Sequence, residues 1–448
     1  MGLIVLTRTC LGIALLATLP AWAQVSSPIA PAPGSGSGEQ MAVPPPVSGQ
    51  AYPTEVGGET RSNYLRGGLN FSTAYIDNMY PGSSASPTSE MTYIVLPTIS
   101  FDQTTSRQHR MFTYSPGFTL YEPSSALNEI DQNATVTYQY RLTPHLSISA
   151  NDAFQKSSTS FGASDAFPGG TVSGTPPPMI PDVFVPFAQR LTNTADAQFS
   201  LQYSPNGMIG ASGTLMKLDY PNPSEVSGLY NSDMRGASAF FNRRISAIQY
   251  VGVNYQYARI LAYPVNAQSE TQTQTVVAYY TIYPKPQFSL SISGGPQHYQ
   301  TVETSLPTTA SWGPMVMVSA SWRGRRASFA ASYSQEVTAG GGLLGAFHSN
   351  STTASAHWQA SRALIITAGC GYTTNKSITP LELLATENGD SISGTASVEH
   401  PINAKLKLRF EYDRVYQSYA GIAAISNDPN SDRETISLAW QFTRPLGR

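Results

Sequence analysis

Residues that could do chemistry are few in this chain, and they are scattered. The six His residues stand singly at positions 109, 145, 298, 348, 357 and 400. The sequence contains no Gly-rich phosphate loop ending in Lys, no Gly-x-Ser-x-Gly elbow and no His-Glu-x-x-His zinc motif. Ser is so abundant that a Ser/His pair is expected by chance. We therefore predict that the protein is not an enzyme.

Cysteine usage is equally sparse. Cys10 lies in the N-terminal leader described below, and Cys370 is the other Cys of the chain. One remaining thiol cannot form an internal disulfide or a Cys-based zinc site. We predict no metal site and no cofactor.

One short segment, "KLKLRFEYD", covers residues 405 to 413 and contains five charged residues. Its charged residues alternate with apolar ones, a two-residue period that is typical of an extended strand. "ATVTYQYRL" behaves in the same way and places Gln139 and Arg141 on its polar side. If the apolar faces contact lipid, the polar faces line an aqueous lumen. The residues predicted to line the lumen are Lys405, Lys407, Arg409, Glu411, Asp413, Gln139 and Arg141.

The composition is polar without being charged. The 448 residues are 41% hydrophobic and 12% charged, against about 25% charged in an ordinary soluble domain. Acidic and basic residues number 28 and 26, and this balance predicts no affinity for nucleic acid. No apolar run after the N-terminus approaches the roughly 20 residues of a membrane helix.

The N-terminal segment has the features of an export signal. Arg8 precedes an apolar stretch from Leu11 to Leu19, and Ala21-Trp22-Ala23 is a small-residue cleavage site. We predict a signal peptide at 1–23, a disordered Pro/Gly/Ser-rich periplasmic tail at 24–60, and a β-barrel at 61–448.

Turn signals recur about every 40 residues from Pro205 to Pro401, and alternation flanks each of them. Each repeat is therefore predicted to be a long hairpin, with longer connections at its other end. Counting two strands per hairpin predicts an all-β, closed antiparallel transmembrane barrel of about 18 strands, with 16 as the alternative. A propeller has a similar repeat length, but its strands are shorter than the nine-residue alternation seen here. A soluble sandwich would explain one such strand, but not the whole array together with an export signal.

The last strand resembles the C-terminal assembly signal of bacterial outer-membrane β-barrels, since apolar Ile436, Leu438 and Trp440 alternate toward the aromatic Phe442. The region from about 62 to 443 is similar to a porin-type barrel. The resemblance implies integral location in the bacterial outer membrane, contact with its lipid, and recognition by the barrel-assembly machinery. It also implies tight turns on the periplasmic side. An aromatic girdle at that side is predicted from Trp322, Trp358, Trp440, Phe442 and Tyr283.

Two further groups are candidate sites at the ends of the barrel. A basic periplasmic rim consists of Arg243, Arg244, Arg323, Arg325 and Arg326, whereas acidic residues such as Asp233 and Glu270 fall in the long outer connections. The connection 157 to 189 resembles the constriction loop of porins in its order and length. Its stiffening and charged residues are Asp165, Pro176, Pro177, Pro178 and Asp182. The alternative is an ordinary exposed loop.

These features favour a channel that passes hydrophilic solutes or polysaccharide through a polar lumen. A passive porin needs only the pore and a constriction. A polysaccharide-export barrel, which the chain resembles in its strand number and Pro-rich tail, would also require a periplasmic partner. A third possibility is a structural or adhesin-like barrel with a plugged lumen and no transport role.

Overall fold

In the computed structural model, the described residues are 62–77, 89–105, 107–125, 128–157, 189–222, 229–263, 268–285, 287–303, 308–339, 346–378, 388–419 and 430–446. The predicted signal peptide, the tail and the 158–188 part of the predicted constriction loop lie outside them. The described residues contain no helix long and apolar enough to cross a membrane.

The described chain is built of 18 strands, each 12 to 17 residues long. They are β1 (Ser62–Asp77), β2 (Glu90–Thr104), β3 (Gln108–Glu122), β4 (Glu129–Thr143), β5 (Leu146–Ser157), β6 (Arg190–Ser204), β7 (Gly207–Asp219), β8 (Asn231–Ser246), β9 (Gln249–Tyr263), β10 (Ser269–Lys285), β11 (Phe288–Glu303), β12 (Thr309–Arg323), β13 (Ala327–Ala339), β14 (Ala346–Ser361), β15 (Leu364–Ser377), β16 (Gly389–Pro401), β17 (Leu406–Tyr419) and β18 (Asn430–Pro445).

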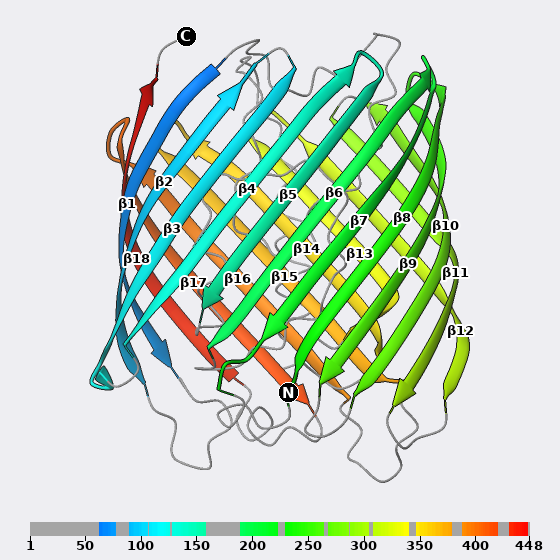
Figure 1. Ribbon diagram of the computed structural model, residues 1–448. Coiled ribbons are helices and arrows are strands. Elements are labelled where there is room, and N and C mark those ends of the chain that lie inside the picture. The colour runs from blue at the N-terminus through cyan, green and yellow to red at the C-terminus, as the bar shows by residue number, and fades with distance from the viewer. Residues whose placement is uncertain are drawn as a thin grey trace.

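These strands form one closed ring. Each strand pairs antiparallel with its neighbours in the chain, and β1 also pairs with β18, from Tyr64 opposite Pro445 to Asp77 opposite Asp432. The tilted strands run around the whole cylinder in Figure 1. Closure gives every strand a paired neighbour on both sides, so the sheet has no edge strand. The predicted closed barrel of 18 strands is confirmed, and the alternative of 16 is wrong.

Connections of two kinds separate the two ends of the barrel. Each even-numbered strand from β2 to β16 is joined to the next strand by a short turn. The turns after Thr143, Ser204 and Ser361, for example, contain two residues each. These turns lie at the upper end in Figure 1, and the paired ends of β1 and β18 lie there too. We call this the tight-turn end and the other the long-loop end.

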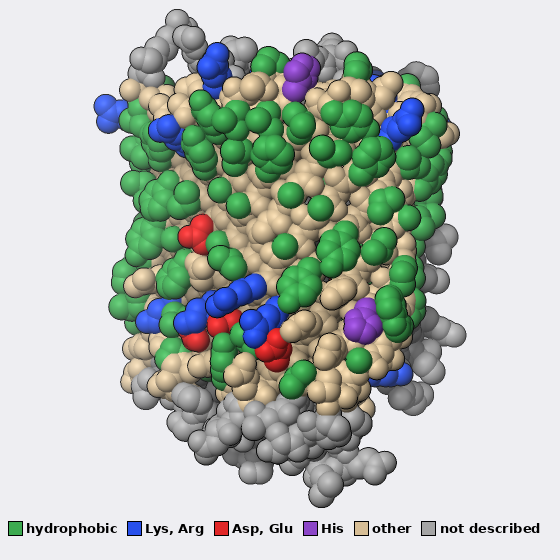
Figure 2. All heavy atoms as spheres, turned by 45° about the vertical axis from the view of Figure 1, so that its right-hand side comes forward, with side chains coloured by type: hydrophobic (Ala, Val, Ile, Leu, Met, Phe, Trp, Pro, Cys, Tyr) green, Lys and Arg blue, Asp and Glu red, His purple; other side chains and the backbone are tan. Residues whose placement is uncertain are grey.

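Alternation gives the wall two chemically different faces, because directly opposed residues of neighbouring strands share a face. On β17, Leu408 and Phe410 are 41% and 47% exposed, whereas Glu411 is 4% exposed. Large apolar side chains on the outer face recur around the ring, and Figure 2 shows few charged side chains across its middle. A closed barrel with an apolar exterior is suited to hydrocarbon. The chain is a closed, 18-stranded antiparallel β-barrel with an apolar exterior.

Candidate channel lining

The inner face of β17 carries four charged residues in alternate positions: Lys407, Arg409, Glu411 and Asp413. Each has an oppositely charged neighbour nearby. Lys407 Nζ lies 2.8 Å from Glu399 Oε1 on β16, and Arg409 forms an ion pair with Glu411. Asp413 stands directly opposite Arg433 of β18. This arrangement balances positive and negative charge along one strip of the wall.

The structure places Lys405 differently from its four companions. It lies in the turn before β17, where its N–H and that of Leu406 donate to the Asn403 side-chain oxygen at 2.8 and 3.0 Å. The Asn side chain thereby holds Lys405 in a local turn, while the Lys405 carbonyl still accepts the Gln441 N–H of β18 at 2.8 Å. Lys405 belongs to the rim of the barrel and not to the strand that lines its interior.

Gln139 and Arg141 lie on the inner face of β4, opposite Ser149 and Ser147 of β5. Ser147 in turn hydrogen-bonds Ser200 of β6 at 2.7 Å. The polar sides of these three strands are thus continuous.

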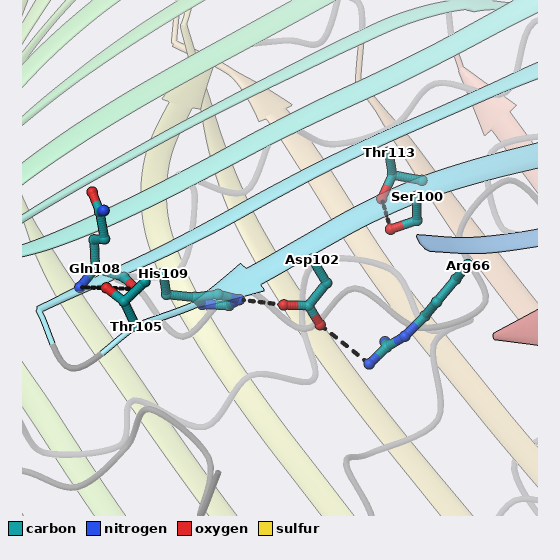
Figure 3. Close-up of polar contacts among 7 residues, drawn as sticks. All are labelled: Arg66, Ser100, Asp102, Thr105, Gln108, His109 and Thr113. Atoms are coloured by element: carbon teal, nitrogen blue, oxygen red, sulfur yellow. Dashed lines mark hydrogen bonds and ion pairs between the residues drawn. The ribbon is translucent and has the colours of Figure 1, made fainter. Parts of the chain in front are cut away.

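A charged cluster that sequence reasoning did not assemble lies inside the tight-turn end (Figure 3). Asp102 Oδ2 lies 3.1 Å from Arg66 Nη2, and Asp102 Oδ1 lies 3.2 Å from His109 Nε2. The three residues come from β1, β2 and β3. The short turn between β2 and β3 is closed by Thr105, whose backbone N–H donates to the Gln108 carbonyl at 2.8 Å. The sequence signal was an acidic residue shortly before a turn and a His shortly after it.

The opposite part of the wall is neutral. The inner positions of β10 from Thr271 to Thr281, and of β11 from Ser289 to Thr301, contain no charged residue. Their hydroxyls bond to one another: Thr271 to Thr301 at 3.0 Å and Thr281 to Ser291 at 2.9 Å. Similar pairs join β11 to β12 and β13 to β14. Hydroxyl groups that can donate and accept provide a surface suited to sugars and water.

The predicted basic rim is divided between two turns. Arg243 and Arg244 are near the end of β8, and the Arg244 Nε donates to the Ser246 carbonyl at 3.1 Å. Arg323 ends β12, and exposed Arg325 and Arg326 follow it in the next turn. All five lie at the tight-turn end, but the structure does not gather them into one patch.

Most of the predicted girdle residues lie outside the barrel at the tight-turn end. Trp440 opposes Leu406 and Leu69, and its ring lies 5.4 Å from that of Phe442. Trp322 and Trp358 are also exposed near that end. Tyr283 is placed differently, because its ring contacts Tyr250 at 5.8 Å. Tyr250 opposes Thr281, an inner residue, and Tyr283 follows Thr281 by two positions, so Tyr283 also lies toward the lumen.

The constriction-loop residues Asp165, Pro176, Pro177, Pro178 and Asp182 lie outside the described residues. Within the described ranges, no group of three or more His, Cys, Asp or Glu side chains could hold a metal ion.

Comparison with known proteins gives structural similarities only. No protein-family model and no curated protein matches the sequence. The fold is similar to Acinetobacter baumannii OccAB4, with TM-score 0.44, 9% identity, and coverage of 86% of this chain and 99% of that one. Pseudomonas aeruginosa OccK2 (OpdF) gives TM-score 0.43, 10% identity and coverage of 86% and 98%. The ferric-catecholate import receptor Fiu from E. coli K12 gives TM-score 0.43 and 11% identity, with coverage of 86% of this chain and 82% of that one. We therefore infer function from the chain's own residues.

Proposed function

We propose that this outer-membrane barrel is a channel that passes hydrophilic solutes through a polar lumen, and that it has no catalytic role. One observation carries the proposal: a single closed ring of 18 strands has an apolar exterior and an interior of hydroxyl, amide and paired charged groups. Barrels of about 16 to 18 strands are too wide for their own side chains to fill. A polar interior of that width favours a water path.

The lining favours passage of small polar solutes over solutes that carry strong charge of one sign. The charges on β16 and β17 are paired with neighbours on the same face, so a passing ion meets a balanced strip and not a field of one sign. The hydroxyl pairs of β10 and β11 offer exchangeable hydrogen bonds without charge. A solute can bind such a wall weakly and leave it, as conduction requires.

Polysaccharide export is the second candidate function. The neutral wall of β10 and β11 supports it, because hydroxyl groups can bind a sugar chain along the barrel axis without trapping it. Export would require a periplasmic partner to deliver the polymer. The predicted tail at 24–60 and the basic residues of the tight-turn end would be the parts available for that contact.

The proposal is tested by conductance of the full-length protein in a planar bilayer. A channel gives discrete, ohmic current steps, and detergent alone gives none. Adding neutral oligosaccharides of increasing length separates the two candidates, since an export barrel should be blocked for longer times by longer chains. Protein that is folded and inserted but never conducts would overturn the channel and favour a plugged, structural or adhesin-like barrel.

A further inference from the structure

The outer face of β7 to β10 carries a group of six charged side chains near the long-loop end. Figure 2 shows a group of blue and red side chains in the lower half of the view. The six residues on β7 to β10 are Lys217, Asp219, Asp233, Arg235, Arg259 and Glu270. We call this set the exterior charged patch.

Register shows that the patch faces away from the lumen. Lys217 opposes Asp233, and Arg235 opposes Arg259. The residues that alternate with them face inward, where Met216 packs against the buried pair Met234 and Ile260. The patch therefore lies on the outer face of the wall, and apolar side chains pack against one another on the inner face behind it. Sequence reasoning assigned Asp233 and Glu270 to outer connections, but they lie on β8 and β10.

The acidic members already have partners within the patch. Arg259 donates to both Glu270 carboxylate oxygens, at 2.8 and 2.7 Å, and Gln272 donates to the same carboxylate at 2.7 Å. Lys217 lies 2.6 Å from Asp219. The Tyr263 hydroxyl donates to Asp233 at 3.0 Å.

Arg235 is different, since it makes no ion pair or hydrogen bond within the described part of the chain. Its side chain is exposed, and the residue directly opposite is another cation, Arg259. Like charges that oppose each other across a strand pair are destabilising. A phosphate bound at Arg235 would remove that repulsion and can accept two parallel N–H bonds from the Arg235 guanidinium, whereas Arg259 already donates two such bonds to Glu270.

The position of Arg235 along the strand indicates where such an anion would come from. A membrane strand needs about 10 residues to cross, and β8 has 16. Its ends therefore extend beyond the hydrocarbon, and Arg235 is the fifth residue from the long-loop end. The long apolar stem of Arg lets its charged head reach the headgroup level from there. The anions at this level, outside the barrel, are lipid phosphates.

We propose that Arg235, together with Arg259 and Lys217, binds the phosphate of a lipid headgroup in the leaflet at the long-loop end. A second copy of the chain fits the patch less well, because the acids of an identical patch are already paired and offer Arg235 no free carboxylate. The inference depends on the barrel lying in a membrane and does not depend on transport.

Native mass spectrometry of the full-length protein in detergent tests the proposal, with phosphatidic acid as the phosphomonoester probe and phosphatidylcholine as the comparison lipid. We expect retention of phosphatidic acid over phosphatidylcholine. Arg235→Gln should weaken phosphatidic acid binding about fivefold and leave phosphatidylcholine unchanged. Arg110→Gln is the matched control, because Arg110 is also exterior but lies at the tight-turn end, 5.7 Å from the Tyr138 ring. A gel shift on boiling verifies that each variant is folded.

Three results would overturn the proposal. The first is equal phosphatidic acid binding by the Arg235→Gln variant and the unaltered protein. The second is an oligomer that Arg235→Gln dissociates without any lipid preference, which would make the patch a contact between copies. The third is displacement of phosphatidic acid by an equal concentration of inorganic phosphate, which would mean that the site takes a free anion.

Discussion

Asp102 lies between Arg66 and His109 inside the tight-turn end, with Arg66 at 3.1 Å and His109 at 3.2 Å. Its charge matters for ions in the lumen more than for stability, because the Arg66 side chain is half exposed and such pairs contribute about 1 kcal/mol or less. Removing the carboxylate leaves Arg66 without its neutralising partner. The mouth of the lumen then becomes more positive.

We therefore expect Asp102→Asn to shift the channel toward anions. The measurement is the reversal potential in a salt gradient across a planar bilayer. Asp233→Asn is the control, since it makes the same change of charge on the outer face of β8. If the two variants shift the reversal potential equally, Asp102 does not act on ions in the lumen.

Gly295 is a second position where adding a single side chain should change the stability of the barrel. A Cβ on residue 295 would lie 1.8 Å from the Val276 carbonyl oxygen and 2.9 Å from the Val276 carbonyl carbon. Both are backbone atoms of β10, so relief requires the two strands to separate. Pro296, the next residue, has no N–H to donate to the ladder, and this part of β11 can approach β10 closely only with glycine.

Gly295→Ala should lower the free energy of unfolding by about 1 to 3 kcal/mol, the usual cost of overpacking. Gly394→Ala is the matched control, because a Cβ at that position of β16 would have no neighbouring atom within 4 Å. Urea titration of barrels folded into lipid vesicles measures both. Equal stability of the two variants would contradict the close approach at Gly295.

The seam between β1 and β18 is the pairing that turns a sheet into a barrel. Its two strands lie at opposite ends of the described chain, yet their residues oppose each other in an unbroken register that includes Asn70 and Ala439. Directly opposed residues of antiparallel strands have Cβ atoms about 4.5 to 5.5 Å apart, which is close to disulfide geometry.

A double variant, Asn70→Cys with Ala439→Cys, should form a disulfide on mild oxidation and run faster after boiling without reductant. Cys370 is replaced by Ser in this background. The control pairs Asn70→Cys with Ser200→Cys, which lies on β6, and should not cross-link. Cross-linking of the control but not of the seam pair would rule out the closure.

The stability of the complete barrel in a membrane depends on which face of its wall contacts lipid. Val136, in the middle of β4, is 45% exposed on the outer face, whereas its neighbour Thr135 opposes Thr113 and Ala153 on the inner face. Membrane insertion should distinguish these adjacent positions, because a cation in hydrocarbon is costly and one in an aqueous lumen is solvated.

Val136→Arg should destabilise the folded barrel by about 2 to 4 kcal/mol, the cost of Arg near the bilayer midplane. Thr135→Arg, one residue away, should cost much less. Urea titration in vesicles, read as the fraction of protein that shifts on boiling, gives both values. Similar losses would mean that the outer face does not contact acyl chains.

Local alternation made much of this architecture predictable. In β17, the two-residue period alone separates Leu408 and Phe410 from Arg409 and Glu411, because successive residues of a strand point to opposite faces. The same rule identified the number of strands and the two kinds of connection. The interpretation of two positions was wrong. Asn403 holds Lys405 in a turn, and Tyr283 faces inward because it lies two positions after the inner residue Thr281.

The sequence by itself determined the strands and their two faces, since each depends on neighbours within a few positions. The tertiary structure alone decided the register in which neighbouring strands meet. Arg66 reaches Asp102 only through the pairing of β1 with β2, and Arg235 faces Arg259 only through the pairing of β8 with β9. Register is set jointly by turn geometry and by the packing of all the strands, so no single segment of the chain contains it.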